Sequence, residues 1–159
     1  PIPQQKPPPV VTTILQSVGD ETIPDGCFQF TSDMFLRFTE IETGRYAEVT
    51  PIHNKPLLIG RSHKSLPMQP DVDLTPFLSE QHGVSRRHAL MRWRDLRLEM
   101  QDLNSTNGTS INGFRFHPKE THEIRNGDVL TLGRITVKVA FMSKETDRAN
   151  SVTDRLDNK

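Results

Sequence analysis

Apolar and polar residues alternate along several short stretches of this chain. Three stretches between residues 28 and 142 repeat with a period of two, and each is expected to form a strand with one buried face. Their apolar positions are Met34, Leu36 and Phe38, then Leu96, Leu98 and Met100, and then Ile135, Val137, Val139 and Phe141. Shorter runs of extended character lie at residues 46–52, 56–59, 72–75, 89–93 and 129–132. No stretch of about 12 residues shows the apolar stripe of an amphipathic helix.

Turn signals separate these stretches at short intervals. Asn-Gly pairs occur at residues 107–108, 112–113 and 126–127, and such pairs favour tight turns with positive φ. Many short strands joined by frequent turns are typical of an all-β protein, and in particular of an antiparallel β-sandwich. We therefore predict one such domain over residues 28–142.

The two ends of the chain differ from this middle part. Residues 1–27 include five prolines within the first nine positions, and prolines lack backbone donors for a sheet, so this segment is predicted to be a flexible proline-rich linker. Residues 143–159 are almost all polar or charged and are predicted to form a solvated tail. The expected organisation is a sandwich with disordered or loosely attached termini, and the start at Pro1 instead of Met suggests a fragment.

Charge and composition argue against several classes of function. The 159 residues carry 20 Lys and Arg against 20 Asp and Glu, so the chain has no net charge. Proteins that coat nucleic acids or bind membrane surfaces depend on an excess of positive charge. The single Cys27 cannot form an internal disulfide or a cysteine-rich zinc site, and no apolar run approaches the roughly 18 residues of a membrane span. We expect a cytoplasmic protein without membrane insertion.

Three polar islands fall between the predicted strands, at residues 59–62, 83–89 and 102–109, and should therefore lie on loops. They contain Gly60-Arg61, Ser85-Arg86-Arg87-His88 and Asn107-Gly108, and Asn112-Gly113 follows the last of them. This order and spacing resemble the forkhead-associated (FHA) family of phosphothreonine-binding domains, over roughly residues 34–141. The resemblance implies a SMAD/FHA-like sandwich of about eleven strands, whose loops at one end bind phosphothreonine in partner proteins of a Ser/Thr kinase pathway.

Five residues are candidates for phosphopeptide binding, namely Arg61, Ser85, Arg86, Thr106 and Asn107. The guanidinium of Arg61 offers a planar fork that matches phosphate oxygens, and the Ser85 hydroxyl can donate to one of them. By resemblance, Arg86 adds a second cation and Thr106 a further donor. The side-chain amide of Asn107 is both donor and acceptor, which suits the main chain of an extended peptide.

Five further residues are expected to support the site structurally, namely Gly60, His88, Gly108, Asn112 and Gly113. Gly108 and Gly113 permit the positive φ of tight turns. His88 corresponds to a family position that braces the loops by hydrogen bonds. Asn112 is expected to tie its own turn or to brace the loop of Asn107.

The residues argue against catalysis and against a bound cofactor or metal. Ser85 and His88 are only three residues apart on one loop, which does not supply a nucleophile, a base and an orienting group. The six histidines are scattered, without the spacing of a metal site. Trp93 lies among three arginines, but seven basic against four acidic residues over residues 60–97 is too small a surplus for a nucleic-acid duplex. We predict a non-enzymatic signalling adaptor that binds no nucleic acid.

The specificity of such a site is predictable only in part. The loop at residues 104–107 is expected to hold the threonine methyl group and so to favour phosphothreonine over phosphoserine. The loop at residues 78–83 should face the residue three positions after the phosphothreonine, but its composition predicts no preference. Two alternatives stay open, a phosphorylation-independent interaction module and self-docking of a phosphorylated threonine from one of the tails. The candidates for self-docking are Thr12, Thr13, Thr146 and Thr153. The sequence predicts no oligomeric state.

Overall fold

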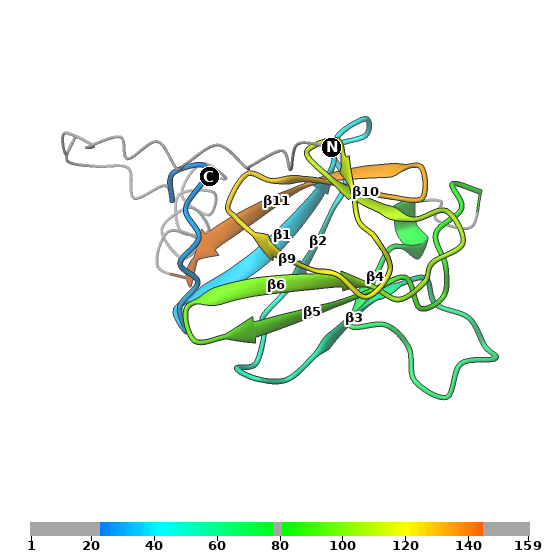
Figure 1. The fold of residues 1–159 in the computed structure, drawn as a ribbon, viewed down its shortest axis with the longest axis horizontal. Coiled ribbons are helices and arrows are strands. Elements are labelled where there is room, and N and C mark those ends of the chain that lie inside the picture. The colour runs from blue at the N-terminus through cyan, green and yellow to red at the C-terminus, as the bar shows by residue number, and fades with distance from the viewer. Residues whose placement is uncertain (1–22, 78–80, 145–159) are drawn as a thin grey trace, which may run out of the picture.

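The computed structural model describes residues 23–77 and 81–144 and folds this part of the chain into eleven strands and one short 3₁₀ helix (Figure 1). The strands are β1 (Met34–Glu40), β2 (Tyr46–Val49), β3 (Leu57–Gly60), β4 (Val72–Asp73), β5 (Ala89–Arg94), β6 (Arg97–Asp102), β7 (Thr109–Ile111), β8 (Phe114–Arg115), β9 (Thr121–Ile124), β10 (Val129–Leu132) and β11 (Ile135–Ser143). The 3₁₀ helix spans Thr75–Phe77. The predicted all-β class and the number of strands are confirmed.

Two sheets form the sandwich. The six-stranded sheet has the order β2-β1-β11-β10-β7-β8, and the five-stranded sheet has the order β4-β3-β5-β6-β9. The described strand pairs are antiparallel except for β3 and β4, which run parallel with Ile59 opposite Val72 and Gly60 opposite Asp73. The predicted antiparallel β-sandwich is confirmed, with this one parallel pair at the edge of the five-stranded sheet. A long connection, and not a hairpin, leads from β3 to β4, and parallel strands require such a connection.

The core lies between the sheets and is built by the alternating positions. Leu36 and Phe38 of β1, Leu98 of β6, and Val137 and Val139 of β11 are at most 1 % exposed and belong to one apolar cluster. Burial of one such side chain stabilises the fold by roughly 1.5–3 kcal/mol. A shift of a strand by one residue would turn its apolar set towards water, so the core also fixes the register. The loops therefore start from a rigid base.

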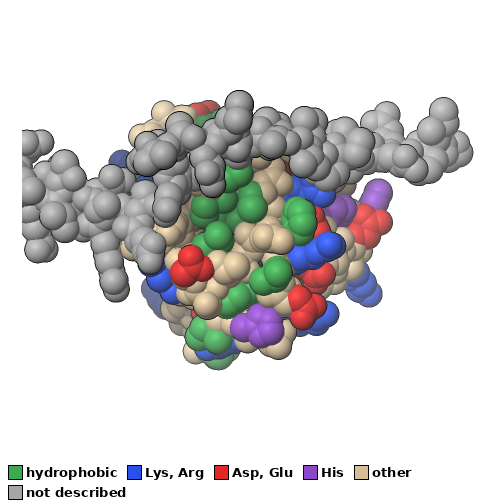
Figure 2. Space-filling model, turned by 90° about the vertical axis from the view of Figure 1, so that its left-hand side faces the viewer, with side chains coloured by type: hydrophobic (Ala, Val, Ile, Leu, Met, Phe, Trp, Pro, Cys, Tyr) green, Lys and Arg blue, Asp and Glu red, His purple; other side chains and the backbone are tan. Residues whose placement is uncertain are grey.

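Leu96 departs from the predicted alternation. It lies with Asp95 in the two-residue turn between β5 and β6, and it is 48 % exposed. Asp95 has a φ of 51°, as expected in the tight turns that join two antiparallel strands. Because the turn interrupts the alternation, the buried face of β6 begins at Leu98. Figure 2 shows this end of the molecule, where hydrophobic side chains lie among charged ones.

Strands β7, β8 and β9 lie outside the stretches that the sequence predicts as strands. They are two to four residues long, which is too short to show a period. A tight turn at Asn112 and Gly113, with φ values of 49° and 83°, joins β7 to β8. Two of these strands depend on partners far along the chain, since β7 pairs with β10 and β9 pairs with β6, while β8 pairs with its neighbour β7.

Residues 23–27 lie against the sandwich, although their composition assigns them to the linker. The side-chain amide of Asn126 donates to the carbonyl oxygens of Ile23 (2.7 Å) and Pro24 (3.1 Å), and its main-chain N–H donates to Cys27 (2.8 Å). Residues 23–27 are therefore bonded to the sandwich, although it was predicted to start at residue 28. The remaining parts of the predicted linker and tail lie outside the described residues.

The β3–β4, β4–β5 and β6–β7 loops leave the same end of the sandwich as the β10–β11 turn, on the right in Figure 1. Main-chain hydrogen bonds hold this end together, from Gly133 to Gly108 (3.0 Å) and from Arg134 to His82 (2.8 Å). The three polar islands of the sequence fall on these three loops, so the fold gathers them at one end.

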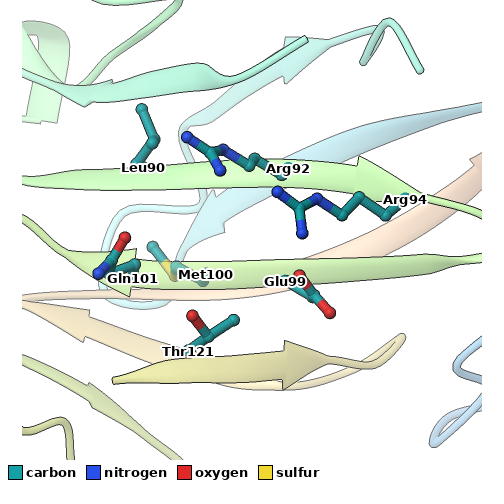
Figure 3. Close-up of a pocket in the computed structure, with 7 residues that line it drawn as sticks. All are labelled: Leu90, Arg92, Arg94, Glu99, Met100, Gln101 and Thr121. Carbon is teal, nitrogen blue, oxygen red and sulfur yellow. The ribbon is translucent and has the colours of Figure 1, made fainter. Parts of the chain in front are cut away.

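A shallow hollow lies elsewhere, on the outer face of the five-stranded sheet (Figure 3). It is lined by Leu90, Arg92, Arg94, Glu99, Met100, Gln101 and Thr121. Trp93 packs against the core instead, and its ring meets that of Phe30 edge to face at 5.4 Å. The sequence cluster of Trp93 and its neighbouring arginines is therefore divided between two faces of β5.

Candidate functional site

Arg61 follows directly after β3, and its side chain is fixed close to the loops. Its Nε donates to the carbonyl oxygen of Val84 at 2.9 Å, which holds the guanidinium beside the β4–β5 loop. Within residues 23–77 and 81–144 neither terminal NH₂ group of Arg61 has a hydrogen-bond partner. Its remaining N–H groups are therefore available to a ligand.

Gly60 allows the β3 strand to approach the β4–β5 loop. A Cβ atom at this position would lie 2.0 Å from the carbonyl oxygen of Arg86. The same approach brings the main-chain N–H of His88 within 2.9 Å of the carbonyl oxygen of Ile59. A larger residue at position 60 would separate Arg61 from Ser85.

Asp73, a residue that the sequence pattern did not reveal, anchors the chain after Arg61. Its carboxylate accepts hydrogen bonds from the main chain (3.1 Å) and hydroxyl of Ser62, and from the main chain (2.9 Å) and hydroxyl (2.5 Å) of Thr75. Burial of Asp73 opposes its ionisation, but these hydrogen bonds outweigh burial and hold the pKa of Asp73 below its ordinary value. The cluster fixes the start of the β3–β4 loop and with it the position of Arg61.

Ser85 and Thr106 meet across two loops. The main-chain N–H of Thr106 donates to Oγ of Ser85 at 3.1 Å. Because the Ser85 oxygen accepts this bond, its own hydrogen remains available to donate to a ligand. Ser85 is half-buried and Thr106 is exposed, so both lie at the surface of the site.

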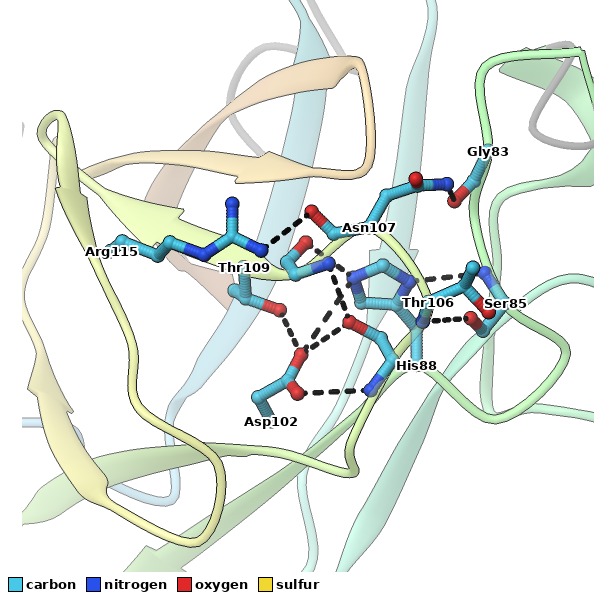
Figure 4. A network of polar contacts seen from close by, with 10 residues as sticks. Gly83, Ser85, His88, Asp102, Thr106, Asn107, Thr109 and Arg115 are labelled. Atoms are coloured by element: carbon cyan, nitrogen blue, oxygen red, sulfur yellow. Dashed lines mark hydrogen bonds and ion pairs between the residues drawn. The ribbon is translucent and has the colours of Figure 1, made fainter.

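His88 lies in the interior beneath these two residues (Figure 4). Its Nδ1 accepts the main-chain N–H of Ser85 at 3.0 Å, and its Nε2 donates to the carbonyl oxygen of Gly108 at 3.0 Å. Burial lowers the pKa of His88, although the Gly108 carbonyl and the nearby Asp102 oppose this. The neutral ring thus joins the β4–β5 loop to the β6–β7 loop, which is the bracing position expected for it. Both of its nitrogens are occupied, so it cannot act as a base for Ser85.

Asp102 is a second supporting carboxylate that was not predicted. It accepts hydrogen bonds from the main chain (3.0 Å) and hydroxyl (2.6 Å) of Ser105 and from the hydroxyl of Thr109 (2.7 Å). Burial disfavours the ionised carboxylate and raises its pKa, but the hydrogen bonds from Ser105 and Thr109 outweigh burial and hold the pKa of Asp102 below its ordinary value. Its spacing of three residues from Ser105 is a signal of a side-chain-capped turn, and this signal could have identified it.

Asn107 ties the two loops together at the surface. Its Nδ2 donates to the carbonyl oxygen of Gly83 at 2.8 Å. A Cβ atom on Gly83 would lie 2.3 Å from this nitrogen, so only glycine permits the contact. The amide was expected to contact a peptide with both its donor and its acceptor. One of its two amide N–H groups is engaged inside the protein, which leaves the second N–H and Oδ1 for a ligand.

Arg86 points towards the β3–β4 loop. Its NH1 donates to Oγ of Ser65 at 3.1 Å, and its NH2 lies 3.4 Å from Nε2 of His63. The two guanidinium groups are therefore held differently. Side chains of the β3–β4 loop hold that of Arg86, and the main chain of the β4–β5 loop holds that of Arg61.

Asn112 acts on its own turn and not on the loop of Asn107. Its Nδ2 donates to Oδ1 of Asp128, and its Oδ1 accepts the main-chain N–H of Val129, both at 2.9 Å. These bonds join the β7–β8 turn to β10. A Cβ atom on Gly113 would meet nothing within 4 Å, so this glycine is needed for its positive φ and not for space.

The arrangement is suited to binding an anion. Arg61 and Arg86 supply positive charge, and Ser85 and Thr106 supply hydroxyl donors at the same end of the sandwich. Nowhere in the described residues do three or more His, Cys, Asp or Glu side chains form a group that could hold a metal ion. Over the same residues, no helix has the length and apolar character that a bilayer crossing requires.

Residues 57–133 match the family model of the FHA domain. The chain contains an FHA domain. It is 38 % identical over 81 residues to protein FraH of Nostoc sp., and the aligned region covers 48 % of this chain and 25 % of FraH. It is 42 % identical over 57 residues to the FHA domain-containing protein FhaA of Mycobacterium tuberculosis, and the aligned region covers 36 % of this chain and 10 % of FhaA. The chain thus spans a quarter or less of the length of these relatives.

Solved structures extend the match beyond residues 57–133. The solution structure of the FHA domain of an Arabidopsis thaliana hypothetical protein aligns with a TM-score of 0.53 at 23 % identity, covering 80 % of this chain and 96 % of that one. At this identity the likeness shows the fold alone. The FHA fold therefore includes strands on both sides of the residues that the family model matches.

Proposed function

We propose that this FHA domain binds phosphothreonine in partner proteins, with the phosphate held by Arg61 and Ser85. The anchored guanidinium of Arg61 carries the proposal, because its Nε is bonded to Val84, the residue before Ser85, and both NH₂ groups lack a partner among the described residues. The Ser85 hydroxyl accepts from Thr106 and so keeps its hydrogen for a phosphate oxygen. A phosphate dianion is best bound by a fixed cation together with several donors.

Three further residues complete the proposed site. Arg86 adds positive charge from its place beside the β3–β4 loop. Thr106 adds a hydroxyl donor at the exposed tip of the β6–β7 loop. Asn107 accepts a main-chain N–H of the peptide through Oδ1 and donates its second amide N–H to a peptide carbonyl, while its first N–H is bonded to Gly83.

The expected affinity is modest. Three or four charge-assisted hydrogen bonds contribute on the order of 1.5–3 kcal/mol each. Ordering the peptide and the loss of its free motion offset much of this sum. A net binding free energy of about −8 kcal/mol, or a micromolar Kd, results.

The test is a phosphothreonine-peptide library screened by fluorescence polarisation, followed by titration of the best peptide and its unphosphorylated form. Arg61→Ala and Ser85→Ala should each weaken binding at least about tenfold, which corresponds to about 1.4 kcal/mol. Arg94→Ala removes the same charge from the outer face of the five-stranded sheet and should leave the Kd unchanged. Binding that survives both site changes, or that ignores the phosphate, would support a phosphorylation-independent module instead.

Self-docking can be separated from partner binding in the same assay. Its candidate threonines, at positions 12, 13, 146 and 153, lie outside the described residues. Phosphorylation of the chain by a Thr kinase, verified by mass, should not block the peptide if the site serves partners. Loss of peptide binding after phosphorylation would favour self-docking.

A preference for phosphothreonine over phosphoserine is expected from residues 104–107. Burial of one methyl group is worth about 0.8 kcal/mol, or about fourfold in affinity. A β-branched side chain also loses less freedom on binding, which adds to the preference. Matched phosphothreonine and phosphoserine peptides measure this difference, and equal affinities would contradict a methyl pocket in this loop.

The proposed role is that of a non-enzymatic adaptor in Ser/Thr kinase signalling. The bonds that occupy both nitrogens of His88 support this, because His88 then cannot serve as a base for Ser85. Its partners would be proteins that a kinase has phosphorylated on threonine, which places its action in the cytoplasm, where ATP is available. Incubation with phosphothreonine peptide should release no phosphate, and release of phosphate that depends on Ser85 would contradict the adaptor role.

A further inference from the structure

Arg115 brings a guanidinium to the site from a strand that the sequence did not connect with it. It ends β8, opposite Ser110 of β7, and its side chain is exposed. Its NH2 donates to the main-chain carbonyl oxygen of Asn107 at 3.3 Å. A Cβ atom on Gly108 would lie 2.4 Å from this NH2 and 2.7 Å from Cζ. The guanidinium therefore lies against the main chain of Gly108, a place that only glycine leaves open.

Arg115 and Ser85 lie on opposite sides of residues 106–108 (Figure 4). Ser85 contacts the main chain at Thr106, and Arg115 contacts it at Asn107. A peptide whose phosphate lies at Ser85 and whose main chain crosses Asn107 runs towards Arg115. An extended chain advances about 3.3 Å per residue, so Arg115 would meet a side chain within a few residues of the phosphothreonine.

The charge of Arg115 is uncompensated by any carboxylate in the part of the chain that the structure describes. Arg97 and Arg125, in contrast, both pair with Glu123 at 3.1 Å. Arg115 makes a single hydrogen bond, to a main-chain carbonyl, and its Nε and NH1 remain without a partner in the described ranges. The planar fork of a guanidinium matches a carboxylate, with which it can form two parallel bonds.

We propose that Arg115 selects phosphopeptides that carry a carboxylate side chain on the Asn107 side of the phosphothreonine. This inference rests on the proposed phosphopeptide binding and names the chemistry of the partner sequence. The loop at residues 78–83 gave no reason to expect an acidic preference, and β8 supplies the cation instead. Because Arg115 is exposed, the preference for an acid over the matching amide should be about three- to tenfold in affinity.

The test compares phosphothreonine peptides that differ only by Asp or Asn at one position, for each of four positions on either side of the phosphothreonine. Each pair is titrated into the wild-type domain, Arg115→Gln and the control Arg94→Gln. The readout is the ratio of the two Kd values, because this ratio cancels any general effect of a substitution on binding. At one position on one side, wild type and Arg94→Gln should prefer Asp about three- to tenfold, and Arg115→Gln should show a ratio near one. Higher salt should reduce the ratio in wild type, since exposed charges are screened.

Each outcome bears on the proposal. Equal affinities for Asp and Asn peptides at every position, or a ratio that persists in Arg115→Gln, would overturn the role of Arg115. In that case, phosphate-dependent binding that is lost in Arg61→Ala would still support the proposed function. A wild-type domain that binds no phosphothreonine peptide would overturn both. Arg115→Lys keeps the charge without the fork and should give an intermediate ratio, which supports the role of Arg115 even if Arg115→Gln fails to fold.

Discussion

His88 and Gly108 are joined by a hydrogen bond of 3.0 Å between Nε2 and the carbonyl oxygen, in the interior beneath the binding loops. This bond needs a proton on Nε2, while Nδ1 must be free of a proton to accept the N–H of Ser85. The loops are therefore built around the neutral ring in one tautomer. A second proton on Nδ1 would face the main-chain N–H of Ser85, and the hydrogen bond between them would be lost.

We expect the free energy of unfolding to decrease as the pH falls below about 6.5, the ordinary pKa of histidine. Burial holds the pKa of His88 below this value, so on acidification the unfolded chain binds the proton first. Stability is then lost from about pH 6.5 down to the folded pKa, with a slope of at most about 1.4 kcal/mol per pH unit from this group. Urea unfolding at several pH values measures the slope. An NMR titration in which His88 protonates at or above about pH 6.5 would contradict the neutral-ring interpretation.

Asp102→Asn should destabilise the domain by about 1.5–3 kcal/mol at pH 7, because a charged acceptor of three hydrogen bonds is replaced by a neutral one. The pKa of Asp102 lies below its ordinary value, so its contribution is present above about pH 3.8 and is lost as the pH falls through the folded pKa. Chemical denaturation of both proteins at pH 7 and near pH 3 measures the difference, which should shrink at the lower pH. Asp95→Asn, at an exposed turn position with positive φ, is the control and should change stability by at most about 0.5 kcal/mol.

Gly60→Ala should be far more damaging than Gly113→Ala. The new Cβ at position 60 would lie 2.0 Å from a main-chain oxygen, which forces β3 and the β4–β5 loop apart. We expect a loss of more than about 2 kcal/mol and loss of phosphopeptide binding. At position 113 there is open space and only the φ of 83° is unfavourable, at about 1–2 kcal/mol. Thermal melts and peptide titrations of both variants check this order, and similar effects at the two positions would contradict the close approach at Gly60.

Asn107→Asp should loosen the β4–β5 loop. The substitution replaces the NH₂ that donates to Gly83 by an oxygen, which repels the carbonyl it faces. One lost hydrogen bond costs about 0.5–1.5 kcal/mol, and hydrogen exchange of the loop amides should accelerate accordingly. Asn54→Asp makes the same chemical change in the β2–β3 loop and serves as the control. Unchanged exchange around Gly83 would mean that this bond does not hold the loop.

Much of the fold could be predicted from local patterns. The alternation in β1, in β11 and in β6 from Leu98 onwards reports directly which face each strand buries, because the side-chain period of a strand is two. The pattern failed at Leu96, where a two-residue turn interrupts it, and in β7 to β9, which are too short to carry a period. The parallel pairing of β3 with β4 was also missed, since it depends on the path of a long connection.

The amino-acid sequence alone was enough to predict the family, the three polar islands and the residue types that bind a phosphate. Only the tertiary structure decided which of them cooperate. Asn107 and Gly83 are 24 positions apart, and their hydrogen bond exists because two loops leave the same end of two sheets. The supporting carboxylate of Asp73 and the approach of Arg115 to Asn107 depend in the same way on strand pairing. A local pattern records whether a side chain is buried, but a contact between distant segments is fixed only when the core sets the order and register of the strands.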